Sequence, residues 1–147
     1  MNREDVTYKI LSVKRNNNIK WHKVAKEVGL SKEWVTAACL GQMSFNEEEA
    51  HKIAKIFGLN AEETQLLMVT PYKGSLPTVI PTDPLIYRFY ELINVYGLTF
   101  KELIHEEFGD GIMSAIDFKM DLQREKDPNG DRVKITMSGK FLPYKRY

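Results

Sequence analysis

The sequence predicts an α+β protein, with a bundle of helices in its first half and with helices and a small antiparallel sheet in its second half. Three observations support this prediction. Apolar residues recur at helical spacing as far as about residue 69, a proline-rich segment then interrupts them, and the period changes to two from residue 116 onward. We therefore expect domains at residues 1–72 and 84–147, joined by a linker at residues 73–83.

The first half contains five amphipathic stretches, near residues 5–16, 20–28, 31–40, 46–57 and 61–69. Glycines that can end a helix follow three of them, at Gly29, Gly41 and Gly58. Side chains that can cap a helix precede three of them, at Ser31, Asn46 and Asn60. These signals predict about five short helices.

Four prolines and a glycine mark residues 71–84, PYKGSLPTVIPTDP, and they exclude both a continuing helix and a central strand. Asp83 can then cap, and Pro84 can open, a helix that runs to about Tyr96. A second helix is expected from residue 99 to residue 108, with Gly109 at its end.

An alternating pattern begins at Ile116 and continues to Gln123, which predicts a half-buried strand. The turn sequence DPNG follows at residues 127–130, and the alternation resumes from Val133 to Met137. We expect an antiparallel hairpin, with a third short strand at residues 141–142. So small a sheet has open edges, and a second copy of the chain is expected to cover them.

The charge of the chain is balanced. Its 147 residues carry 21 Lys and Arg against 20 Asp and Glu, which gives a net charge of +1. Residues 1–72 hold 10 basic and 9 acidic side chains, so the first half is not a basic module. We expect neither a signal segment nor a membrane span, and we expect a cytoplasmic location with the mitochondrial matrix as the alternative.

Residues 19–40 have the spacing of a helix-turn-helix like that of the lambda-repressor fold, with Ala25, Gly29 and Val35 at the packing and turn positions. The expected recognition helix, SKEWVTAACL, offers one lysine, and no arginine cluster is present to contact phosphates. We therefore expect the bundle to serve structure or assembly, with no nucleic-acid partner. A DNA-binding regulator is the alternative function.

The histidines and the cysteine predict no metal site. Glu106 follows His105, but position 109 is glycine, so the zinc-helix motif is incomplete. His22 and His51 lie on separate predicted helices and are expected at the surface or in packing. The single cysteine, Cys39, excludes an intramolecular disulfide, and its small apolar neighbours favour a buried side chain over a nucleophile.

Two groups of residues can bind an anion. Arg88 and Glu91 stand three residues apart on one helix face among large apolar residues, so they form either a surface ion pair or a buried pair that serves an anion site. The segment Gly109-Asp110-Gly111 is either a tight turn or, together with Ser114, a place where backbone N–H groups and a hydroxyl stabilise an anion.

The segments that carry these residues, PTDPLIYRFYELINVYG (81–97) and HEEFGDGIMSAIDFK (105–119), resemble the signature of the cyanase, or cyanate hydratase, family. The resemblance extends over the whole chain, including residues 30–42 and 139–147. It implies a cyanate lyase with Arg88, Glu91 and Ser114 as catalytic residues and with Arg88, Ser114 and Ala115 binding substrate. It also implies bicarbonate as co-substrate, no metal or other cofactor, and a decamer of five interlocking dimers with active sites at subunit interfaces.

The chemistry that the resemblance implies explains these residue types. Cyanate and bicarbonate are both anions, so a guanidinium can offset their repulsion and orient them through paired N–H groups. Bicarbonate would attack cyanate to give a dianionic intermediate, which loses carbon dioxide to leave carbamate. Glu91 either assists a proton transfer or holds Arg88 in one rotamer. A non-catalytic scaffold that has kept the fold is a further hypothesis.

Overall fold

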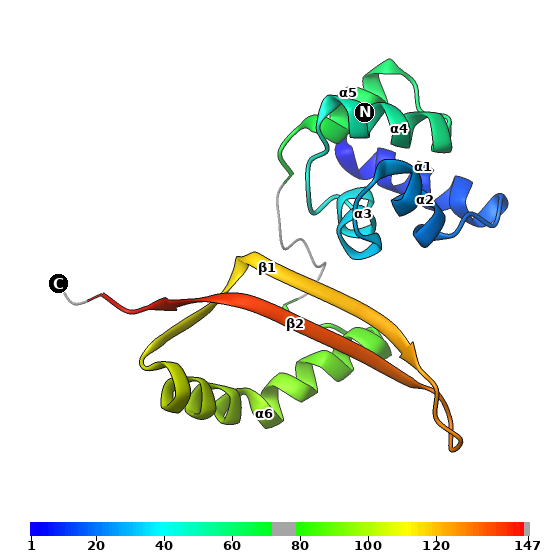
Figure 1. Ribbon diagram of the computed structural model, residues 1–147. Coiled ribbons are helices and arrows are strands. Elements are labelled where there is room, and N and C mark those ends of the chain that lie inside the picture. Colours follow the sequence, from blue (N-terminus) through cyan, green and yellow to red (C-terminus); the bar gives the residue numbers. More distant parts are fainter. Residues whose placement is uncertain (72–78, 146–147) are drawn as a thin grey trace. The chain divides into compact units, whose positions relative to one another are not determined.

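The computed structural model describes residues 1–71 and 79–145, and the chain divides into two compact units, Met1–Ser75 and Leu76–Tyr147 (Figure 1). Most of the predicted linker, residues 73–78, lies outside the described part. The first unit is a bundle of five helices, as the sequence predicts: α1 (Arg3–Asn16), α2 (Trp21–Val28), α3 (Lys32–Cys39), α4 (Glu47–Phe57) and α5 (Ala61–Met68). The second unit contains one helix and a hairpin, so the α+β prediction is confirmed.

The helices of the bundle begin and end where the sequence predicts. Ser31, Asn46 and Asn60 each accept a hydrogen bond from the backbone N–H three residues later, which satisfies a donor that the first turn leaves free. Gly29 and Gly58 end α2 and α4 in the left-handed conformation, with φ of 88° and 63°.

The core of the bundle takes apolar side chains from all five helices: Val6, Ile10, Val24, Val35, Ile53, Phe57 and Leu67. Cys39 is fully buried in this core, as predicted, and burial raises the pKa of its thiol to about 12. His22 and His51 are exposed, which confirms their expected place at the surface.

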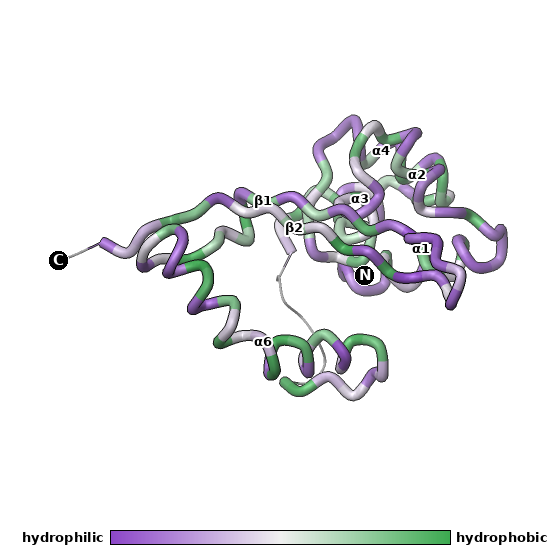
Figure 2. The backbone as a smooth tube through the Cα atoms, turned by 60° about the horizontal axis from the view of Figure 1, so that its bottom comes forward, coloured by the Kyte–Doolittle hydropathy of each residue, from purple (hydrophilic) through white to green (hydrophobic). Residues whose placement is uncertain are grey.

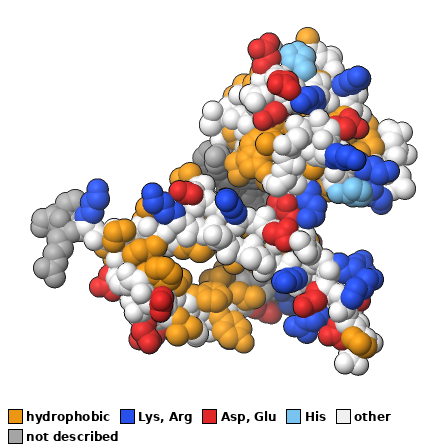
Figure 3. All heavy atoms as spheres, viewed as in Figure 1, with side chains coloured by type: hydrophobic (Ala, Val, Ile, Leu, Met, Phe, Trp, Pro, Cys, Tyr) orange, Lys and Arg blue, Asp and Glu red, His pale blue; other side chains and the backbone are white. Residues whose placement is uncertain are grey.

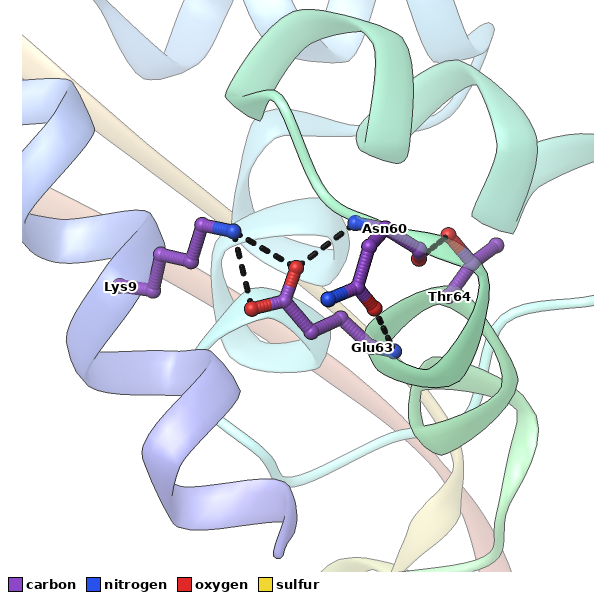
Figure 4. Close-up of polar contacts among 4 residues, drawn as sticks. All are labelled: Lys9, Asn60, Glu63 and Thr64. Carbon is purple, nitrogen blue, oxygen red and sulfur yellow. Dashed lines mark hydrogen bonds and ion pairs between the residues drawn. The ribbon is translucent and has the colours of Figure 1, made fainter. Parts of the chain in front are cut away.

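One buried carboxylate ties the first helix of the bundle to the last (Figure 4). Glu63 is only 4% exposed, and its two oxygens accept hydrogen bonds of 2.9 and 2.7 Å from Lys9 Nζ. Glu63 Oε2 also accepts the backbone N–H of Asn60 at 2.7 Å. The hydrogen bond from Lys9 and then that from Asn60 lower the pKa of Glu63, so the carboxylate remains ionised in the folded bundle.

The second unit opens with one long helix, α6 (Pro84–Phe108). Asp83 caps it and Pro84 occupies its first position, both as predicted. The prediction of two helices, ending and restarting around Gly97, is wrong because the helix continues through that residue. A glycine inside a helix costs only about 1 kcal/mol relative to alanine, which is too little to end it here.

The sheet is a hairpin of β1 (Gly111–Glu125) and β2 (Arg132–Pro143), paired antiparallel. The predicted third strand at residues 141–142 is wrong, because those residues belong to β2 and pair with Met113 and Ile112. β1 begins five residues before the alternating pattern does. A break in register between Met113 and Phe118 accounts for this difference, since residues on its two sides follow different alternations.

The second unit leaves an unusually large apolar surface uncovered. None of the residues of α6, all of which the structure describes, is buried, although the helix is apolar along most of its length (Figure 2). Hydrophobic side chains gather on its surface (Figure 3), and Leu98 of α6 and Ile116 of β1 are 83% and 97% exposed. Among the described residues, no helix has the length and hydropathy needed to cross a membrane.

Candidate active site

Arg88 and Glu91 lie in the first turns of α6, where the cap at Asp83 fixes the start of the helix. Their spacing places both side chains on one face, and Arg88 Nη1 lies 3.4 Å from Glu91 Oε1. This distance is long for a hydrogen bond between charged groups, which are typically about 2.7–2.9 Å apart. Within residues 1–71 and 79–145 the guanidinium has no further hydrogen-bond partner, so N–H groups are left for an anion.

Of the two alternatives for this pair, a surface ion pair or a buried one, a single chain shows the surface pair. The side chains of Arg88 and Glu91 are 65% and 46% exposed. Their large neighbours Ile86, Phe89 and Tyr90 are exposed as well. Within residues 79–145, the pair and its apolar neighbours are thus open to solvent.

Ser114 lies near the start of β1 and is only 7% exposed. Its Oγ accepts the backbone N–H groups of Ile116 at 3.1 Å and Asp117 at 2.9 Å. Two bonds accepted by the same oxygen fix its position and polarise the hydroxyl as a donor. The arrangement can therefore present one O–H to an anion, whereas the N–H groups of Ile116 and Asp117 are already used.

Ser114 and Ala115 belong to a bulge of four residues in β1. Met113 pairs with Phe141, and the next pair is Phe118 with Gly139, so residues 114–117 stand opposite Lys140 alone. A bulge re-aims side chains that regular pairing would direct to alternate faces. The bulge was not predicted from the sequence, although the late start of the alternation at residue 116 indicates it.

The turn before β1 has glycines for two different reasons. Gly109 follows α6 with a φ of 89°, a conformation that favours glycine, whereas Gly111 is a strand residue whose added Cβ would collide with the Leu142 carbonyl and the Phe141 ring. His105 contacts this turn, with Nε2 3.1 Å from the Gly111 carbonyl oxygen and Nδ1 3.5 Å from Asp110 Oδ1. This contact of His105 was not predicted from the sequence, where the residue was considered only as a metal ligand.

The structure brings Arg88 and Glu91 together but not with Ser114. Arg88 is 20 residues before the end of α6, about 30 Å along the helix axis at 1.5 Å per residue. Within residues 79–145, no hydrogen bond or ion pair joins Ser114 to either charged residue. In the part of the chain that the structure describes, no group of three or more His, Cys, Asp or Glu could hold a metal ion.

Comparisons with known proteins cover both units. Residues 3–71 match the family described as cyanate hydratase, N-terminal, and residues 78–146 match the one described as cyanate lyase C-terminal domain. The chain is 69% identical to the cyanate hydratase of Albidiferax ferrireducens and 62% identical to that of Polynucleobacter asymbioticus, over all 147 residues and the full length of each. The crystal structure of cyanase from T. urticae is similar with a TM-score of 0.81 at 38% identity, covering 94% of this chain and 96% of that one. None of these similarities supports the DNA-binding alternative.

Proposed function

This chain belongs to the cyanate hydratase family of lyases, and we propose that it decomposes cyanate in a bicarbonate-dependent reaction at a site that contains Arg88, Glu91, Ser114 and Ala115. The observation that carries the proposal is full-length identity of 62–69% to cyanate hydratases, together with the polarised Ser114 hydroxyl. Cyanate and bicarbonate are the proposed substrates.

The main obstacle in this reaction is the repulsion between two anions. Two unit charges 4 Å apart repel by about 1 kcal/mol in water but by about 4 kcal/mol at the effective dielectric constant near a protein surface. A guanidinium can offset this repulsion and can bind both anions through several N–H groups. Arg88 is the proposed source of that charge, because Glu91, at 3.4 Å, is its one side-chain partner among the described residues and leaves most of its N–H donors available.

The reaction balances without a protein nucleophile. An oxygen of bicarbonate attacks the cyanate carbon and gives a dianionic intermediate, whose C–O bond to the former bicarbonate carbon then breaks to release carbon dioxide. The carbamate that remains takes up protons and decomposes to ammonia and a second carbon dioxide. One cyanate, one bicarbonate and two protons are consumed, and the proposed reaction uses no metal or cofactor.

Ser114 and Ala115 are the proposed binding partners for the oxygens of the reacting anions. The Ser114 Oγ already accepts two backbone N–H groups, so its own O–H is available to donate to an anion oxygen. Glu91 either holds Arg88 in one rotamer or assists a proton transfer, and its contact with Arg88 supports the first role.

We propose that the working molecule is a homo-oligomer. None of the 25 residues of α6 is buried, and apolar side chains such as Leu98 are up to 83% exposed. Stable monomers rarely expose so much contiguous apolar surface to water. The family resemblance implies a decamer of five dimers with sites between subunits. A site between copies can bring Arg88 of one chain to Ser114 of another. The proposed location is cytoplasmic, with no membrane or nucleic-acid partner.

Ammonia release from cyanate, with and without added bicarbonate, tests the proposed function. We expect rapid release in the presence of bicarbonate and a loss of most turnover in carbonate-free buffer. Full turnover without bicarbonate would remove it as co-substrate. No ammonia under either condition would leave the scaffold hypothesis as the better one.

A further inference from the structure

We infer that Gly139 is a positioning residue for Ser114, an inference that rests on the proposed function of Ser114. Gly139 lies on β2 at the edge of the bulge, where it pairs with Phe118. On the other strand, residues 114–117 are the ones that leave the regular ladder. The two positions are 25 residues apart in the sequence and adjacent in space.

The space beside Gly139 is filled by the Ser114 peptide. A methyl group added at Gly139 would lie less than 3.0 Å from the Ser114 carbonyl oxygen, a separation that real Cβ atoms essentially never show. The same methyl group would lie 2.5 Å from Met113 Cγ, but that side chain is flexible and can move away. The carbonyl belongs to the backbone and can give way only if the Ser114 peptide shifts.

Conformation does not explain this glycine. Gly109 and Gly130 have φ of 89° and 121°, in the region that favours glycine, whereas Gly139 has no such positive φ. An alanine could therefore adopt the backbone conformation of residue 139. Only the missing side chain matters, because its absence lets the bulge approach the neighbouring strand.

A shift of the Ser114 peptide would move the hydroxyl that the proposed reaction uses. Ordinary contact begins near 3.4 Å, well beyond the separation at Gly139, so the carbonyl must move by more than a few tenths of an ångström. The hydrogen bonds from Ile116 and Asp117 to Ser114 Oγ depend on the same local backbone. Displacements approaching 1 Å can reduce turnover by as much as about 100-fold.

The first test compares Gly139→Ala with Gly130→Ala in the full-length protein. Gly130 lies in the hairpin turn with open space around it, so its substitution strains the backbone without touching the bulge. We expect Gly139→Ala to lower kcat/KM for cyanate by about 10- to 100-fold per folded molecule. Gly130→Ala should lower stability and leave the activity of the folded protein within about threefold. Equal loss in both variants, or near-normal turnover by folded Gly139→Ala, would overturn the inference.

A second measurement does not depend on activity. Hydrogen exchange at the N–H groups of Ile116 and Asp117 reports directly on their bonds to Ser114 Oγ. We expect exchange to become at least about tenfold faster in Gly139→Ala and to stay unchanged in Gly130→Ala. If the unaltered protein releases no ammonia, the proposed function fails while this measurement still decides whether Gly139 positions Ser114.

The double variant Gly139→Ala with Met113→Ala separates the two collisions and also covers poor folding of the single variant. Removing the Met113 side chain relieves its contact and leaves the carbonyl contact in place. We expect the double variant to fold and to retain both the loss of turnover and the faster exchange. Recovery of normal turnover and normal exchange would assign the effect to Met113. Failure of the double variant to fold would show that Gly139 serves the sheet as a whole. Either result rejects the inference.

Discussion

Arg88 Nη1 lies 3.4 Å from Glu91 Oε1 on a helix that has no buried residue. The pair is too exposed in one chain to contribute much stability, since exposed ion pairs are worth about 0–1 kcal/mol. Its apolar neighbours on α6, such as Phe89 and Tyr90, are also exposed within the described residues of the second unit. Stability therefore does not explain the pair, which agrees with its proposed role in binding anions.

Arg88→Lys should lose most of the cyanate activity, although it keeps the positive charge. A lysine has one compact ammonium group and cannot supply the planar, paired donors that two anions require. We expect kcat/KM to fall by about 100-fold or more, the equivalent of about 2.7 kcal/mol. Arg124→Lys is the matched control, because Arg124 pairs with Asp131 at the tip of the hairpin, outside the proposed site. Near-normal turnover by folded Arg88→Lys would remove Arg88 from the site.

Glu63→Gln should destabilise the bundle in a pH-dependent manner. The pKa of Glu63 is lowered in the folded state, so its stabilisation is present above the unfolded pKa of about 4.3 and is lost as the pH falls through the lower, folded value. We expect unfolding of the variant at pH 7 to require about 1–3 kcal/mol less than that of the unaltered protein. This difference should shrink toward zero in acid.

Urea unfolding followed by tryptophan fluorescence measures this effect, because both tryptophans, Trp21 and Trp34, lie in the bundle. Glu62→Gln is the control, since Glu62 is the exposed neighbour of Glu63. A constant difference between Glu63→Gln and the unaltered protein from pH 3 to pH 7 would contradict the assigned role of the Lys9 pair.

Cys39 should be unreactive in the folded protein. Its side chain is fully buried and the pKa of its thiol is raised to about 12, so at pH 8 only about one molecule in ten thousand carries the thiolate. We expect alkylation by iodoacetamide at pH 8 to be at least about 100-fold slower than in the urea-unfolded chain. Rapid loss of the free thiol from native protein would show that the bundle opens far more readily than its packing indicates.

Local chemistry explains why the first unit could be predicted so closely. Ser31, Asn46 and Asn60 act on backbone groups within three residues, and Gly29 and Gly58 act at a single residue. The pair of Lys9 and Glu63 could not be predicted in this way. It joins residues 54 positions apart, and their contact depends on how the helices pack.

The second unit was harder to predict because its decisive contacts are not local. At the bulge, the Ser114 carbonyl lies against Gly139 of the other strand. The sequence around either residue does not indicate this contact. The apolar neighbours of Arg88 left open whether its side chain is exposed or buried, and within one chain it is 65% exposed. The catalytic roles of Arg88, Glu91 and Ser114, and the binding role of Ala115, remain predictions from the family resemblance.

One active site should draw Arg88 and Ser114 from different subunits. Within the described range 79–145, no hydrogen bond or ion pair joins Arg88 to Ser114. Arg88 also lies about 30 Å along α6 from the helix end that leads into β1. We therefore expect Arg88→Ala and Ser114→Ala, each inactive as a pure assembly, to regain activity when they are unfolded together and reassembled as mixed oligomers. Random mixing of equal amounts gives a quarter of such two-residue sites both intact residues, so activity should rise to a fraction of about 0.25 of the unaltered level at most. The two pure variants, taken separately through the same unfolding and reassembly, are the controls, and native mass spectrometry confirms that the oligomers are mixed. If mixed oligomers form and remain as inactive as the pure ones, the two residues meet within one chain, or every copy at a site must be intact.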